Sequence, residues 1–151
     1  MGFCGVCVAI CMLLLGVVSA HADQQVTFSA TKHERERKIV KALLKKEIRE
    51  AKTLSKEPVQ IDIALADLNH DGTREILAYV RQYPYFCGTE GCWFVIFRQE
   101  GRTWRNILQL IIQENVSLST LSTSDFVDLI VEDKSVWSWH GYKYDFSHKL
   151  P

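Results

Sequence analysis

Apolar side chains recur at three- and four-residue spacing in the segment before Pro58. This spacing lines one side of a helix. A capping-box pair, Thr31 and Glu34, stands at its start, and Pro58 follows its end. The pattern therefore predicts an amphipathic helix over about 32–52. Its apolar face carries Ile39, Val40, Leu43, Leu44, Ile48, Ala51 and Leu54.

After Pro58 the pattern changes to short runs in which apolar and polar positions alternate and aromatic residues are frequent. Runs of this kind, bounded by turn residues, predict antiparallel strands. Gly101 and Gly141 mark two of the hairpins. The runs are 59–66, 73–81, 93–98, 103–112, 126–132, 136–139 and 142–146.

The strand region matches itself, because residues 63–78 align without a gap with residues 116–131. Further along, the hairpin at Gly101 falls on the hairpin at Gly141. This self-similarity predicts two degenerate four-stranded repeats. They cover about 59–112 and 113–146.

Together these segments predict a single α+β domain over residues 23–151. In this fold the N-terminal amphipathic helix packs on an antiparallel β-sheet built from the two repeats. The length suffices for one domain with a modest core.

Between the first two predicted strands, oxygen-bearing side chains occupy every second position: Asp67, Asn69, Asp71, Thr73 and Glu75. A hard cation takes such a cage of oxygen ligands, and Gly72 permits the sharp backbone reversal. The loop is not an EF-hand, because its twelfth position is Ala78 and its flanks are typical of strands. The pattern predicts calcium as a cofactor. A plain hairpin turn with Asx hydrogen bonds is the alternative.

The same residues resemble the Asp-x-Asn-x-Asp-Gly-x-x-Glu loops of FG-GAP and VCBS-type repeats. In that family the loops lie between strands of β-propeller-like blades, the calcium turn is structural, and the function is recognition of a protein or a glycan. The resemblance therefore implies a binding module. In the second repeat Thr120, Ser122 and Ser124 replace the acidic residues, so we expect a turn there without an ion.

We interpret residues 1–22 as a secretory signal peptide. They contain an apolar run over 6–18, followed by small residues at Ala20 and Ala22, the two candidate cleavage sites. Because neither Lys nor Arg precedes the run, a retained membrane anchor is an alternative, and a lipid anchor is a weaker one. We expect cleavage, no stable membrane anchor afterwards, and a periplasmic or secreted protein.

Beyond the signal the chain has two cysteines, Cys87 and Cys92. An even pair in an exported chain predicts a disulfide that closes a tight loop. A metal site and a redox pair are less favoured, since there is no second pair and four residues separate the two cysteines. The surrounding insertion, 82–92, has no counterpart in the second repeat. We predict that it forms the binding surface, through Tyr83, Tyr85, Phe86, Thr89 and Glu90.

The whole chain has 18 basic and 18 acidic residues, but their distribution is uneven. Residues 32–57 hold ten Lys or Arg against five Glu, so the predicted helix is strongly basic. The simplest interpretation is that the polar face of the helix is solvated and carries intrahelical ion pairs such as Lys46 with Glu50. The alternative is a surface that recognises an anionic partner or a membrane.

Motifs for catalysis are absent from the sequence: it has no phosphate loop, metal-binding His-Glu-x-x-His helix or nucleophile elbow. We therefore expect an exported non-enzymatic binding module, in concrete form a periplasmic inhibitor or immunity-type protein that acts on an envelope enzyme. The expected partner is a protein of the cell envelope and not a nucleic acid. A small envelope hydrolase and a glycan- or membrane-surface-binding protein are the alternatives.

Overall fold

The computed structural model describes residues 22–113 and 115–151. The predicted signal peptide, residues 1–22, lies outside the described residues except for Ala22. Within these ranges no helix is both long enough and apolar enough to span a bilayer.

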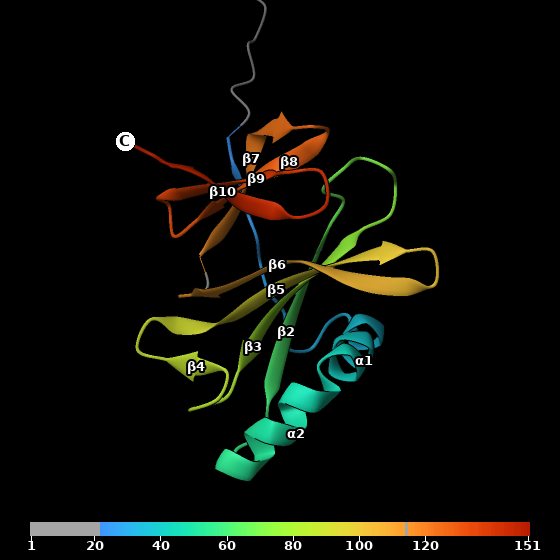
Figure 1. The fold of residues 1–151 in the computed structure, drawn as a ribbon, viewed down its shortest axis with the longest axis vertical. Coiled ribbons are helices and arrows are strands. Elements are labelled where there is room, and N and C mark those ends of the chain that lie inside the picture. Colours follow the sequence, from blue (N-terminus) through green and yellow to red (C-terminus); the bar gives the residue numbers. More distant parts are fainter. Residues whose placement is uncertain (1–21, 114) are drawn as a thin grey trace, which may run out of the picture.

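Five strands form an antiparallel sheet in the middle of the molecule, named here the central sheet (Figure 1). Strand β3 lies between β2 and β5, and both β4 and β6 pair with β5. Strand β2 is therefore at an edge. The five strands are β2 (Gln60–Ala66), β3 (Glu75–Arg81), β4 (Cys87–Gly88), β5 (Gly91–Glu100) and β6 (Thr103–Ile112).

The second half of the chain forms a second antiparallel sheet, which lies above the central sheet in Figure 1. Its order is β1-β7-β8-β9-β10, so a short N-terminal strand completes it at one edge. The strands are β1 (Gln24–Gln25), β7 (Val116–Thr123), β8 (Phe126–Val131), β9 (Ser135–Trp139) and β10 (Tyr144–Lys149).

The central sheet is buried on both faces. On β3, Leu77 and Tyr79 belong to the core shared with the second sheet, whereas Ile76, Ala78 and Val80 belong to a separate cluster on the opposite face. A strand covered on both sides is apolar without alternation, which accounts for the composition of β3. The second sheet contributes Val116, Phe126, Leu129, Val131, Trp139 and Tyr144 to the shared core.

Two short helices lie against the outer side of the central sheet (Figure 1). They are α1 (Glu34–Leu43) and α2 (Lys45–Leu54). Buried Val40 of α1, Ala51 of α2 and Leu44 between the helices join the separate apolar cluster of the central sheet. The sheet thus separates the helices from the second sheet.

The predicted α+β fold is wrong, because the protein is mostly strand, at 50% against 16% helix, and consists of two antiparallel sheets. The single helix predicted over 32–52 is two short helices that meet at Leu44. Leu44 is buried and continues the apolar stripe, so the spacing held no sign of the break. The strands also divide into two layers, since each meander, β2-β3-β5-β6 and β7-β8-β9-β10, has an apolar face to bury against the other.

Gly91 provides a test of this packing. Its φ is +127°, and a Cβ atom at this position would lie 2.1 Å from the carbonyl oxygen of Ile112. Backbone cannot yield as a flexible side chain can, so we expect Gly91→Ala to lower the free energy of unfolding by about 3 kcal/mol or more. Gly88→Ala, which would meet open space, is the matched control. Equal urea midpoints for the two variants would contradict this packing.

Candidate functional site

The turn between β2 and β3 is held by its own side chains. Asp67 accepts hydrogen bonds from the backbone amides of Asp71 at 3.2 Å and Gly72 at 3.0 Å. Asp71 accepts from the Asn69 side chain and from the Thr73 amide, each at 2.7 Å. The Asn69 hydrogen bond, followed by that from Thr73, lowers the pKa of Asp71 below its usual value. Four of the five predicted calcium ligands therefore meet in one turn.

The fifth predicted ligand, Glu75, points into the protein and is 1% exposed. One carboxylate oxygen accepts a hydrogen bond from the Leu68 amide at 2.8 Å, and the other lies 4.0 Å from Nε of Arg98. Burial raises the pKa of Glu75. In the described part of the chain, no group of three or more His, Cys, Asp or Glu side chains is arranged to hold a metal. Glu75 in this orientation closes the base of the turn, and its role as an ion ligand stays a prediction.

The Glu75 contact continues into the second sheet. The carbonyl of Leu68 accepts the Val127 amide at 2.7 Å. The Arg98 guanidinium lies 5.1 Å from the centre of the Phe126 ring and 5.9 Å from that of Trp139, within the range of cation–π attraction. The turn therefore joins the two sheets.

The predicted disulfide between Cys87 and Cys92 is confirmed. Directly before the disulfide loop, Phe86 is fully buried, and the Tyr85 ring packs against it with centroids 4.9 Å apart. The Tyr85 hydroxyl donates to Glu50 of α2 at 2.7 Å, and this hydrogen bond raises the pKa of Tyr85 to about 12. Two of the predicted contact aromatics thus attach the loop to the body of the protein.

The other predicted contact residues of the insertion stay exposed. Tyr83 is 66% exposed, and Thr89 and Glu90 are exposed at the tip between β4 and β5. They lie outside the tyrosine–phenylalanine contact that fixes the loop. The insertion therefore offers one free aromatic ring to a partner.

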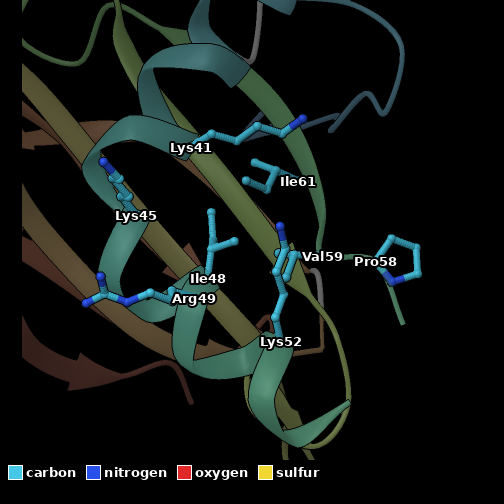
Figure 2. A pocket seen from close by; sticks show the side chains of 8 residues that line it. All are labelled: Lys41, Lys45, Ile48, Arg49, Lys52, Pro58, Val59 and Ile61. Carbon is cyan, nitrogen blue, oxygen red and sulfur yellow. The ribbon is translucent and has the colours of Figure 1, made fainter. Parts of the chain in front are cut away.

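A groove of about 500 Å³ lies between the helices and the start of β2 (Figure 2). Its floor is aliphatic and its rim is cationic. Figure 2 shows the side chains of Lys41 and Lys52 extending from the helices toward the strand segment. The groove is lined by Lys41, Lys45, Ile48, Arg49, Lys52, Pro58, Val59 and Ile61.

The helical repeat gathers the four cations of this groove, which are three or four residues apart: Lys41, Lys45, Arg49 and Lys52. Among the described residues none of them forms an ion pair. The acidic residue Glu50 lies elsewhere on α2, where Tyr85 and Lys46 engage it. The rim therefore carries positive charge without internal compensation.

Sequence reasoning recognised the basic helix but did not find the groove. The spacing of the four cations was visible in the sequence. The floor of the groove could not be seen in the sequence, because Pro58 and Val59 meet the helices only after β2 folds back along them.

Comparison of the chain with models of known protein families, with curated proteins and with solved structures found no match. The resemblance of the β2–β3 turn to FG-GAP and VCBS-type loops stays a prediction. Function is therefore inferred from the geometry of the chain itself.

The buried carboxyl group of Glu75 gives a prediction for pH. A raised pKa in the folded state means that this group stabilises the protein at low pH and that the contribution is lost as pH rises through the folded pKa. Relative to Glu75→Gln, the wild-type free energy of unfolding should therefore increase as pH falls from about 7 toward about 4.5. Urea denaturation across this range measures the difference.

Asp71→Asn is the control for this experiment. The pKa of Asp71 is lowered, so its titration lies below the chosen window, and its pH profile should run parallel to that of the wild type. A Glu75→Gln profile parallel to the wild type would contradict the effect of burial.

Proposed function

We propose that this protein is an exported, non-enzymatic binding module, and that its groove between the helices and β2 contacts a protein partner in the cell envelope. The observation that carries the proposal is a groove with an aliphatic floor and four lining cations, none of which forms an ion pair in the described part of the chain. A periplasmic inhibitor or immunity-type protein that acts on an envelope enzyme is the concrete form. Calcium at the turn between β2 and β3 is a separate part of the proposal.

Charge and apolar surface support recognition in different ways. Unpaired surface cations steer an anionic partner toward the site and reject cationic ones. An aliphatic floor that is partly open to solvent provides the area whose burial holds the partner. A solvated helix face accounts for the charges alone, but it does not account for their position around Val59 and Ile61.

Export is supported by the sequence of residues 1–22 and by the disulfide. The bond between Cys87 and Cys92 is compatible with an oxidising compartment. Periplasmic or secreted localisation remains part of the proposal.

The alternative of a small hydrolase has weaker support. His70 lines a second hollow together with Asp67 and Ser122, which is the most enzyme-like grouping in the described residues. No hydrogen bond joins these side chains there, and the Asp67 carboxylate is engaged by the amides of its own turn. A base without an oriented partner is a poor activator of a hydroxyl group.

A matched pair of double variants tests the groove. Lys41→Glu with Lys45→Glu reverses two rim charges, whereas Lys38→Glu with Lys46→Glu makes the same change outside the groove on the same two helices. With each protein immobilised, retention of the envelope partner should fall roughly tenfold or more for the rim variant only, because two attractive charges become repulsive. Retention by wild type should also weaken as salt is raised.

Equal retention by the two double variants would contradict the groove. If Tyr83→Ala instead abolished retention, the contact surface would be the disulfide loop. Circular dichroism of all variants checks that each one is folded.

The calcium part of the proposal is tested by thermal unfolding. A ligand that binds only the folded state stabilises it by roughly 2.7 kcal/mol at one hundred times its dissociation constant. Calcium should therefore raise Tm, and Asp71→Ala should remove the response. Ser124→Ala, in the aligned turn of the second sheet, should keep it. Identical melting curves in calcium and in chelator would mean that the segment is a hairpin turn that binds no calcium.

A further inference from the structure

We propose that the occupant of the groove is an extended acidic peptide segment of the partner, which adds to the free edge of β2 as a further antiparallel or parallel strand. This inference rests on the proposed function and specifies the chemistry of the partner. It depends on three features of the described residues: an uncovered stretch of strand edge, the aliphatic floor and the cationic rim.

The upper part of the β2 edge is already covered. Ser29 and Ile63 exchange two backbone hydrogen bonds of 3.0 Å, so the backbone groups of Ile63 face away from β3. Outward-facing groups recur at every second residue of an edge strand, which places those of Ile61 on the same side, and Val59 directly precedes the first residue of the strand. The Arg37 guanidinium donates to the Ile61 carbonyl at 2.8 Å.

Below Arg37 the edge is open. Among the described residues no hydrogen bond involves the backbone amide or carbonyl of Val59, and the alternation leaves the Ile61 amide directed away from β3. Both residues line the groove. An exposed strand edge is a template for a further strand, and its main-chain hydrogen bonds supply affinity.

The side chains of such a strand would meet two different environments. Successive residues of an extended peptide point to opposite sides, so only every second side chain of an added strand faces the groove, where Ile48, Val59 and the rim cations all lie. A short segment whose groove-facing positions carry both acidic and aliphatic residues therefore fits this surface.

An anionic lipid shares the charge of such a peptide but not its backbone. A lipid lacks the regular series of main-chain donors and acceptors that pairs with a strand edge. The open edge therefore favours a peptide, and lipid binding becomes an outcome that the experiment can detect.

The experiment uses the isotopically labelled exported protein and three probes. The first probe is a synthetic acetylated and amidated peptide of seven residues in which Glu and Val take turns at every second position, with Ser between them. The second is the same peptide with its alternate backbone amides N-methylated, which removes donors but keeps every charge. The third is a vesicle that contains phosphatidylglycerol. Affinity is measured by calorimetry, and backbone contact by amide hydrogen exchange.

Strand addition predicts that the first peptide slows exchange of the Ile61 amide and that N-methylation weakens binding about tenfold or more, because main-chain hydrogen bonds are lost. Lys41→Glu with Lys45→Glu should abolish peptide binding, and Lys38→Glu with Lys46→Glu should preserve it. Equal affinity for the two peptides, or an unprotected Ile61 amide, would overturn strand addition. Binding to vesicles in preference to peptide would assign the groove to a lipid surface.

The experiments test the groove as a contact surface and strand addition to β2 separately. If retention of the envelope partner depends on the rim cations but the two peptides bind equally, the groove remains the contact surface and strand addition is wrong. If retention does not depend on the rim cations, the proposed function of the groove is wrong whatever the peptides do.

Discussion

The buried carboxylate of Glu75 connects the two sheets, and the shape of the molecule depends on this contact. Glu75 accepts the Leu68 amide, and the Leu68 carbonyl accepts the amide of Val127 in the second sheet. Burying a carboxylate is unfavourable unless hydrogen bonds and an opposite charge compensate it. The Leu68 amide and Arg98 compensate it only in part, since burial still raises the pKa of Glu75, and Arg98 is itself held over two aromatic rings of the second sheet. A single charged group therefore fixes the turn, the sheet interface and the stacking partner together.

Because the inner face of the central sheet packs on the second sheet, the helices can pack only on its outer face. Two polar contacts position them. Arg37, which is 6% exposed, donates to the carbonyls of Ser29 and Ile61 and thereby fastens α1 to the edge strand. Glu50 accepts the hydroxyl of Tyr85 and fastens α2 to the disulfide loop. The groove lies beside these two attachments, and one of them ends on Ile61, a residue of its lining.

The sequence revealed local features and concealed those that arise from layering. Strand alternation and the pair Cys87 and Cys92 depend on neighbouring residues, and both could be read directly. The break between the helices at Leu44 could not be read from the sequence, because Leu44 continues the apolar stripe of both helices. The burial of Glu75 could not be read either, since an ion ligand and a buried structural carboxylate have the same spacing in the sequence. Burial is a property of the assembled sheets.

The same distinction applies to the aromatic insertion. Its composition indicated a contact surface, but Phe86 fills the cluster behind the central sheet and Tyr85 is used to hold α2. The insertion thus acts on the groove indirectly, by fixing the helix that carries three of its four cations. A disulfide that shapes this loop consequently also supports the rim, although neither cysteine lines it.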